Sequence, residues 1–319
     1  VNSTIIHGLR ELGHDLIVFG FRQPRQAPIT DPNTVILDVR NLENSAASLL
    51  DKLAWLARAV QKNLPLSASK LADFPESQLL QEVHRAGPFD GYIFNSYQMA
   101  AVFPQFLSDR AIFLAHNIEH VSAQENAQYS KSKIESWLYR RDAKLLKDIE
   151  TRLCDAAGHV WFLSENDQRV LGCSDERSTV IPLVISGATA RPDRQTPKYD
   201  LALIGTWSWK PNEVGLHWFL NEVVPLIDNQ VTIAIAGDVP SGLQVNDPRV
   251  EYYGRVDNAA VFLDAARIIP LISRGGTGVQ LKTIEAFQSG FACVATPSSV
   301  RGIAHVPENC TIAHSPKEF

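Results

Sequence analysis

The chain is poor in the features that mark several classes of protein. It has 4 cysteines in 319 residues, too few and too scattered for a disulfide framework or a zinc ribbon. We therefore expect reduced, buried thiols at Cys154, Cys173, Cys293 and Cys310. No apolar run approaches membrane-spanning length, and no basic-then-apolar leader opens the chain. These absences predict a cytoplasmic protein.

An excess of basic charge is also lacking, because 30 Lys and Arg stand against 35 Asp and Glu, for a net charge of −5. A dedicated nucleic-acid binder needs a concentrated basic surface, so no nucleic acid is expected as a partner. A content of 45% hydrophobic and 20% charged residues is typical of a globular protein, and the length predicts two domains.

Short apolar runs alternate with helical patterns in the first half of the chain. The predicted strands are residues 15–19, 35–39, 91–95, 112–115, 160–163 and 179–181, and the predicted helices between them are residues 42–61, 75–85 and 134–156. This alternation predicts a doubly wound α/β sheet of buried parallel strands. An opening helix ends at Gly13. Because such a helix usually follows a strand, we expect that the first strand of this domain is missing.

A second alternation follows a polar, proline-containing segment at residues 186–199, which we interpret as a linker. Its predicted strands are residues 201–204, 231–236, 250–253, 268–271 and 292–295, and its predicted helices are residues 211–226, 259–266 and 279–289. The sequence thus predicts an N-terminal domain at 1–186 and a C-terminal domain at 187–319. Ligands of open α/β sheets bind at the carboxyl ends of the strands, so a cleft between the domains is the predicted site.

A glycine-rich turn lies where the helix at 279–289 begins. Gly275, Gly276 and Gly278 let the backbone approach an anion, and the following helix directs unpaired N–H groups toward it. Lys282 adds a full charge, and Glu285 lies on the same helix face, where it can accept hydrogen bonds from sugar hydroxyls. The segment is neither a Walker A motif nor the dinucleotide fingerprint. Taken alone, it is equally consistent with a tight strand-to-helix turn.

The order of several motifs resembles the donor half of family 4-like glycosyltransferases (glycosyl transferases group 1). These motifs are Leu203-Ile-Gly205, Ile235-Ala-Gly237, Tyr253-Gly254-Arg-Val-Asp257, Ile269-Pro-Leu, Gly275-Gly276 with Lys282-x-x-Glu285, and Val294-Ala-Thr296. The opening helix, which ends Leu12-Gly13-His14, is similar to that of the family's acceptor domain. The resemblance implies the GT-B fold, in which two Rossmann-like domains face each other across a cleft.

The resemblance also implies a retaining transfer of a sugar from a nucleotide-diphosphate donor to a glycan, lipid-linked or small-molecule acceptor, without cofactor or metal. Lys282 would neutralise the diphosphate, Glu285 would bind the ribose, and His116, which follows the strand at 112–115, would contact the donor sugar. The remaining implied donor-binding residues are Gly205, Lys210, Gly254, Arg255, Val256, Gly275, Gly276, Thr277 and Gly278. Two alternatives stay open: a nucleotide-sugar epimerase of the same fold, and a binding module without turnover.

The chain departs from the family pattern at three places. Thr277 replaces a glutamate that touches the donor sugar in many relatives, which leaves the sugar open. The usual arginine and lysine after the first donor-domain strand are absent, and Lys210 either substitutes for them or is simply solvated. Trp207 and Trp209, in the same segment, either line the cleft or pack in the core. Relatives continue past Phe319, so we expect C-terminal helices to be missing.

Two further segments have competing interpretations. His116-x-x-Glu119-His120 matches a zinc-protease signature, but that motif must lie within one helix, and here a strand-like run leads directly into His116. His116 can also cap the next helix. The basic stretch at residues 131–147, which carries Trp137, is either a peripheral membrane contact or a solvated helix face.

Overall fold

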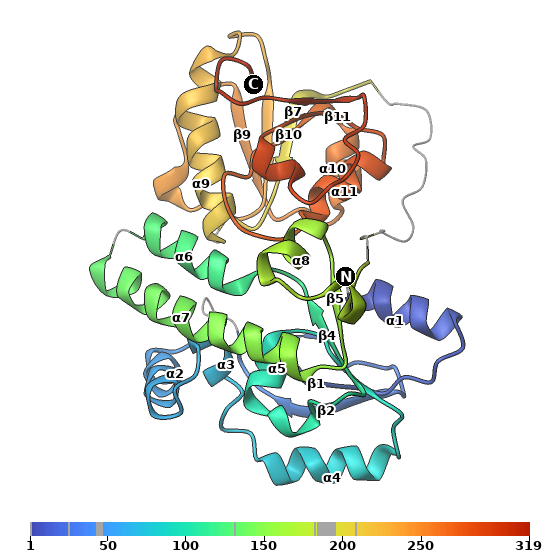
Figure 1. Cartoon of the computed structure of the whole chain (residues 1–319). Coiled ribbons are helices and arrows are strands. Elements are labelled where there is room, and N and C mark those ends of the chain that lie inside the picture. The colour runs from blue at the N-terminus through green and yellow to red at the C-terminus, as the bar shows by residue number, and fades with distance from the viewer. Residues whose placement is uncertain are drawn as a thin grey trace. The chain divides into compact units, whose positions relative to one another are not determined.

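The structure is a computed structural model that describes residues 2–24, 26–42, 47–130, 132–181, 183, 196–207 and 209–319. These residues form two compact units: Val1–Ala123 with Trp137–Ile181, and Gln124–Ser136 with Pro182–Phe319. Most of the predicted linker, including the predicted boundary at Ser186, lies outside the described residues. Figure 1 shows the elements of both units, which are described separately below.

The strands of the first unit are all parallel and form two sheets. One contains β1 (Val18–Arg22) and β2 (Thr34–Val39). The other has the order β3 (Tyr92–Phe94), β4 (Ala111–Ala115), β5 (His159–Phe162) and β6 (Ser178–Val180). All six predicted strands are present. β1 begins three residues later than predicted, because the chain from Gly13 to Ile17 is a loop.

The helices of the first unit begin where local capping chemistry allows. They are α1 (Asn2–Glu11), α2 (Leu49–Gln61), α3 (Leu66–Ser69), α4 (Glu76–Ala86), α5 (Tyr97–Val102), α6 (Glu119–Tyr129), α7 (Lys133–Ala156) and α8 (Glu165–Leu171). Ser48 and Asp51 form a capping box, so α2 starts well after the predicted residue 42. Ser164 caps α8 by accepting the N–H of Asp167 at 3.1 Å, as its position after β5 predicts.

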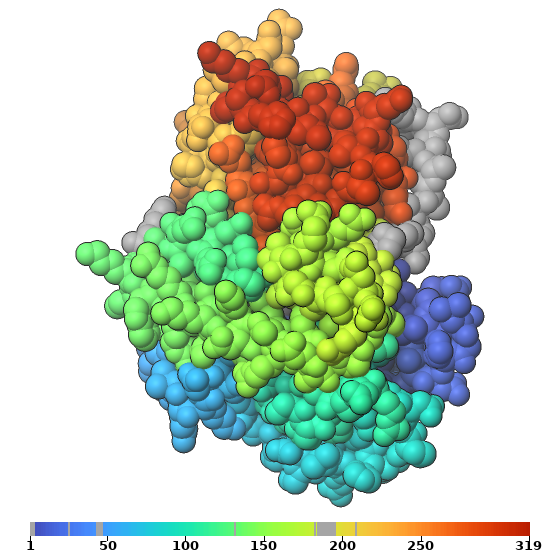
Figure 2. Space-filling view, viewed as in Figure 1, coloured from blue at the N-terminus to red at the C-terminus, as the bar shows by residue number. Residues whose placement is uncertain are grey.

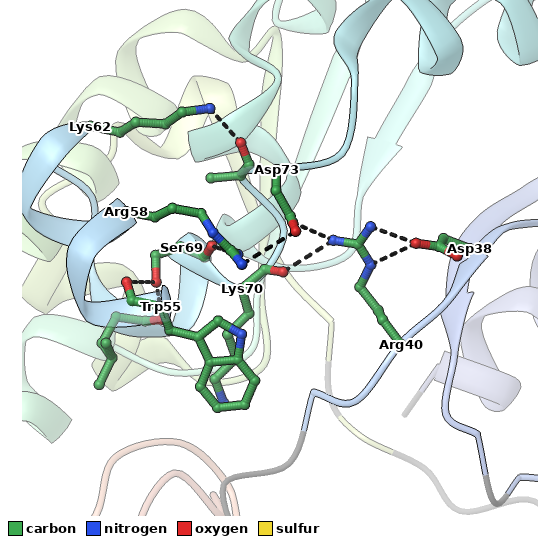
Figure 3. Close-up of polar contacts among 10 residues, drawn as sticks. Asp38, Arg40, Trp55, Arg58, Lys62, Ser69, Lys70 and Asp73 are labelled. Carbon is green, nitrogen blue, oxygen red and sulfur yellow. Dashed lines mark hydrogen bonds and ion pairs between the residues drawn. The ribbon is translucent and has the colours of Figure 1, made fainter. Parts of the chain in front are cut away.

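Basic side chains near the end of β2 and on α2 stabilise the turn after α3 (Figure 3). Arg58 donates to the carbonyl oxygen of Ser69 at 3.1 Å. Arg40 bridges the carboxylates of Asp38 and Asp73 at 2.6 and 2.5 Å. These cations therefore satisfy backbone and carboxylate oxygens within the unit.

The second unit contains one parallel sheet of six strands. Their order is β12 (Cys310–Ile312), β11 (Ala292–Ala295), β10 (Ala266–Leu271), β7 (Tyr199–Ile204), β8 (Ile233–Ala236) and β9 (Val250–Gly254). Numbered along this unit and read from β9, the order is 3-2-1-4-5-6, as in a Rossmann fold. The direction of winding reverses between β7 and β10. All five predicted strands are present, and β12 was not predicted.

Three α-helices connect these strands: α9 (Lys210–Trp218), α10 (Ala259–Asp264) and α11 (Leu281–Gln288). The helix predicted at 211–226 changes pitch, because a π-helical turn at Phe219–Val223 and a 3₁₀ turn at Val224–Leu226 follow α9. Pro225 lies in the last turn and has no N–H to donate to a regular α-helical bond. Within the described part of the chain, no helix has both the length and the apolar character needed to cross a membrane.

Candidate donor-binding site

The loops that leave β7 and β10 meet at the point where the winding of the second sheet reverses. The loop after β7 leads into α9, and the loop after β10 contains the glycine-rich turn and leads into α11. Lys282, in the first turn of α11, donates to the side-chain oxygen of Asn212 in α9 at 3.0 Å. Asn212 in turn donates to the carbonyl oxygen of Thr206 at 3.1 Å. The contact between Lys282 and Asn212 therefore lies where α/β proteins of this topology bind their ligands.

The ammonium group of Lys282 is largely withdrawn from water. Burial lowers the pKa of Lys282 to about 8. Asn212, which contacts the ammonium, is itself buried and is a neutral amide. An anion bound beside Lys282 would supply the negative charge that this amide does not, and would raise the pKa again.

The glycine-rich turn leads into the helix that carries this charge. Gly276 and Gly278 have φ values of +87° and +76°, in the left-handed region that favours glycine. α11 begins at Leu281, two residues later than predicted, and its N-cap residue Gln280 makes no side-chain capping bond. The side chain of Gln280 therefore leaves the N-terminus of α11 uncapped, and an anion at this helix start stays a prediction.

The other predicted donor-binding residues also lie at or near the carboxyl ends of strands. Gly205 directly follows β7 and Gly254 ends β9. Arg255 is exposed, whereas Val256 packs against the core of this unit. The ammonium of Lys210 contacts the carboxylate of Glu213 at 2.9 Å.

Glu285 and the two tryptophans complete the predicted set. Glu285 is exposed, one turn after Lys282 on α11. Trp207 is only 1% exposed and donates to the carbonyl oxygen of Ala236 at 2.8 Å, so it is a core residue. Trp209 is 46% exposed, and its ring lies 3.6 Å from where a side chain on Gly276 would begin. Of the two tryptophans, Trp209 is therefore the one beside the glycine-rich turn.

Three residues at this turn were not found by sequence reasoning. Glu125, in the part of α6 that belongs to the second unit, accepts the backbone N–H of Gly276. The ring of Tyr129 lies 3.1 Å from the place of a side-chain carbon on Gly275. Arg301 donates to the carbonyl oxygen of Gly276. No local pattern marks these residues, because each is separated from the turn by many residues along the chain.

His116 belongs to the first unit and directly follows β4, as predicted. Its Nε2 lies 2.7 Å from the side-chain oxygen of Asn95, which follows β3. Burial lowers the pKa of His116, so its imidazole is neutral at neutral pH. These two side chains lie at the carboxyl edge of the first unit's larger sheet.

The residues of the zinc-protease signature do not share a helix. α6 begins only at Glu119, so His116 lies outside it. The Nδ1 atom of His120 contacts the carboxylate of Glu150 at 2.6 Å, and Glu150 also accepts the N–H of Glu119 at 2.6 Å. Glu150 thus caps α6, and the metalloprotease interpretation fails for the reason that the sequence suggests.

The second unit, which contains this site, is similar to a known family of proteins. A model of the family "Glycosyl transferases group 1" matches residues 198–319, which lie in the second unit. No curated protein matches the sequence. Among solved structures, HepE of Anabaena in complex with UDP is similar with a TM-score of 0.54 and 16% identity, over 76% of this chain and 70% of that one.

Two other solved structures show the same likeness. A TarM variant of S. aureus, in complex with fondaparinux, alpha-GlcNAc-glycerol and UDP, has a TM-score of 0.54 and 14% identity, over 75% of this chain and 48% of that one. A glycosyltransferase of Rickettsia africae has a TM-score of 0.50 and 11% identity, over 97% of this chain and 79% of that one. Structural similarity at such low sequence identity shows the fold of this chain, which is GT-B. Together with the family match, it indicates a glycosyltransferase.

Proposed function

We propose that this chain is a retaining, family 4-like glycosyltransferase that binds the diphosphate of a nucleotide sugar between α9 and α11. The observation that carries the proposal is the half-buried side chain of Lys282, whose ammonium donates to the amide oxygen of Asn212 beside the glycine-rich turn. Similar folds have been solved with UDP, and HepE also with UDP-glucose, so uridine donors are the first to test.

Each predicted residue has a distinct role in this proposal. Lys282 neutralises charge that develops on the departing diphosphate, which lowers the energy of the transition state more than that of the bound donor. The N-terminus of α11 binds phosphate oxygens, and the turn at residues 275–278 lies along the phosphates and the sugar. Glu285 accepts hydrogen bonds from the ribose, and residues 254–256 contact the base. The neutral imidazole of His116 contacts the donor sugar.

The binding step can be tested with a thermal-shift screen of UDP-, GDP- and ADP-linked sugars, followed by calorimetry. We expect stabilisation by one donor class and its loss in Lys282→Ala. Lys317→Ala is the matched control, because Lys317 is an exposed lysine of the same unit. An unchanged response in Lys282→Ala would place the diphosphate elsewhere.

The chemical step is tested separately. A transferase releases nucleoside diphosphate much faster when its acceptor is present, an epimerase changes the donor sugar without an acceptor, and a binding module does neither. The anomeric configuration of the product, read by NMR, tests retention. Inversion at the anomeric carbon would contradict the retaining mechanism.

We further propose that the first unit contacts an anionic membrane surface, as suits a cytoplasmic enzyme acting on lipid-linked acceptors at the inner face of a membrane. Leu50 on α2 is 78% exposed and Trp137 on α7 is 61% exposed. α2 lies beside α7, as Arg141 of α7 donates to the carbonyl oxygen of Ala59 at 2.7 Å (Figures 1 and 2). Further members of this surface are Leu49, Leu53 and Val60, with the cations Lys52, Lys62, Arg140 and Lys144 near them in sequence.

Exposed apolar side chains flanked by cations are typical of interfacial membrane contacts. We expect co-sedimentation with vesicles that contain phosphatidylserine, and much less with purely zwitterionic vesicles. The double variant Leu50→Ser with Trp137→Ser should reduce co-sedimentation with the phosphatidylserine vesicles. The control is Leu226→Ser, which removes a leucine that is 55% exposed in the second unit. This control should leave the co-sedimentation unchanged. Co-sedimentation of the protein that does not depend on anionic lipid would contradict the proposed membrane contact.

A further inference from the structure

Buried polar side chains of the second unit are concentrated around the candidate donor-binding site. Six polar side chains are buried among the described residues of this unit, and each lies in α9 or between the end of β10 and the 3₁₀ turn after β11. They are Asn212, Ser273, Gln280, Thr283, Thr296 and Ser299. Burying a polar group costs free energy unless it is hydrogen-bonded, so these groups stabilise the site only through the partners that they bond.

The hydroxyl of Ser299 binds the chain where β10 leads into the glycine-rich loop. Ser299 is fully buried and lies in the 3₁₀ turn at Pro297–Val300, just after β11. Its hydroxyl donates to the carbonyl oxygen of Leu271 at 2.7 Å and accepts the backbone N–H of Ser273 at 2.9 Å. Thr296 adds a further bond, because its hydroxyl donates to the carbonyl oxygen of Ser273. The segment after β11 therefore fixes the direction in which the loop leaves β10.

The same segment also binds the middle of the loop and the helix that follows it. Thr283 of α11 donates its hydroxyl to the carbonyl oxygen of Ser299 at 2.9 Å. Thr283 is fully buried, so water cannot take the place of this bond. Arg301, directly after the 3₁₀ turn, donates to the carbonyl oxygen of Gly276. Residues 296–301 thus bond the loop at its start, at its middle and at the helix beyond it.

These bonds act on Lys282 through the chain rather than by contact. Lys282 lies one residue before Thr283, and its ammonium donates to Asn212 of α9 at 3.0 Å. Both Lys282 and Thr283 are in the first turn of α11, where Gln280 makes no side-chain capping bond. A shift of this turn would carry the ammonium away from Asn212. The bond from Thr283 to Ser299 therefore restrains the turn of α11 that carries Lys282.

We propose that Thr283 and Ser299 are positioning residues of the donor-binding site, which hold the glycine-rich loop and the first turn of α11 so that Lys282 meets the donor diphosphate. This role rests on the proposed function and deepens it. A diphosphate binds more tightly to an ammonium that is held in place before binding, because less conformational freedom is then lost. Loss of either hydroxyl should therefore weaken donor binding through Lys282, rather than through a contact of its own.

Calorimetric titration of the full chain with UDP tests this role. We expect Ser299→Ala and Thr283→Val each to weaken UDP binding by about tenfold. Thr283→Ser keeps the hydroxyl and should bind UDP nearly as the wild type does. The matched control is Ser69→Ala in the first unit, because Ser69 is also fully buried and its hydroxyl contacts backbone carbonyl oxygens at 2.9 and 2.8 Å. This control should lose stability in urea to a similar degree and leave UDP binding unchanged.

A double-mutant cycle separates positioning from a loss of stability. In a Lys282→Ala background, Ser299→Ala should no longer weaken UDP binding, because its effect acts through the ammonium. Amide hydrogen exchange provides a measurement without any donor. A peptide that covers residues 272–282 should exchange faster in Ser299→Ala than in the wild type, and Ser69→Ala should leave its exchange unchanged.

The possible results distinguish a failure of this role from a failure of the proposed function. UDP binding that Lys282→Ala leaves unchanged would contradict the proposed function. If Lys282→Ala weakens UDP binding but Ser299→Ala and Thr283→Val do not, the donor site stands and the positioning role is wrong. The role is also wrong if Ser299→Ala weakens UDP binding equally with and without Lys282, or if it leaves the exchange of the loop unchanged.

Discussion

The half-buried Lys282 should make donor binding depend on pH, if the diphosphate binds beside it as we propose. Burial lowers the pKa of Lys282 to about 8, so the unliganded protein loses this charge as the pH rises through that value. A bound diphosphate favours the charged form. We expect the dissociation constant for UDP-glucose to rise up to about tenfold per pH unit above about pH 8, and to change little below it. Calorimetry across this pH range measures the dissociation constant. Lys282→Arg should flatten its dependence on pH. A wild-type constant that does not change between about pH 7 and 9 would contradict the assignment.

Asn212 offers a second test, because a small change there alters the charge beside Lys282. In Asn212→Asp a carboxylate would lie about 3.0 Å from the ammonium and close to the expected position of the diphosphate. We predict donor binding weakened by about 10- to 100-fold, or roughly 1.4–2.7 kcal/mol. Asn221→Asp is the matched control, since Asn221 is exposed after α9. Equal effects of the two substitutions would show that proximity to Lys282 is irrelevant.

How far these residues can be predicted depends on how local their signal is. Lys282 and Glu285 follow from glycine spacing and helix geometry within a single segment, and the structure places Lys282 at the predicted helix start. Asn212 contacts Lys282 across 70 residues, and Glu125 contacts Gly276 across 151 residues. Only the sheet topology brings such partners together, so no pattern in a single sequence reveals them.

Among the helices, α9 is fixed in place by a glycine. A side-chain carbon on Gly215 would lie 2.2 Å from the carbonyl oxygen of Ile272, at the start of the glycine-rich loop. Gly215→Ala must therefore move α9 away from this loop, together with Asn212. We predict a loss of about 3 kcal/mol or more in the free energy of unfolding, and weaker donor binding. Urea denaturation measures the first effect. Gly242→Ala, where an added carbon meets nothing within 4 Å, should cost far less, and a similar cost for both would refute the packing argument.

The start of α6 should make stability depend on pH. Burial, with the charge of Glu150, raises the pKa of Glu119 to about 7 from an ordinary value of 4.5. Between these values the folded protein holds a proton that the unfolded chain has released, so this group's contribution to stability falls as pH rises through that window. We expect Glu119→Gln to be more stable than wild type at about pH 8, by about 1–3 kcal/mol, and not at about pH 4.5.

Urea denaturation at the two pH values measures this difference. Glu165→Gln, at an exposed position in the first turn of α8, is the control and should not gain stability in this way. A Glu119→Gln variant that is no more stable than wild type at the higher pH would show that Glu119 ionises there without penalty.

On the scale of the whole chain, the alternation of apolar runs and helical patterns was sufficient to predict the parallel strands of both units. Element ends were less predictable, because local features decide them: Ser48 with Asp51 starts α2, and the regular helix α9 gives way to a π-helical turn at Phe219. The short strand β12 has only three residues, of which two are exposed, so its pattern is too weak to stand out. The adjacency of Cys293 on β11 and Cys310 on β12 likewise follows from topology rather than from spacing.

The first strands of the two units differ in how many neighbouring strands they pair with. β1 and β3 each have one hydrogen-bonded neighbour in the described chain, whereas β7 and β8 each have two. Side chains of β1, β2 and β3 nevertheless pack in one cluster, through Phe19, Leu37 and Tyr92. One more parallel strand between β1 and β3 would give the first unit seven strands in the order 3-2-1-4-5-6-7, of which the first six follow the order of the second unit.

Hydrogen exchange can test this difference between the sheets. Amides on the unpaired edge of a strand open to water more readily than those between two neighbours. We predict faster exchange in peptides that cover β1 and β3 than in peptides that cover β7 and β8, when all are measured in one mass-spectrometry experiment. Because β4 lies between β3 and β5, it provides the control within the first unit and should exchange more slowly than β3. Equal protection of β3 and β4 would mean that both edges of β3 are already paired, and the proposed position for a further strand would then be excluded.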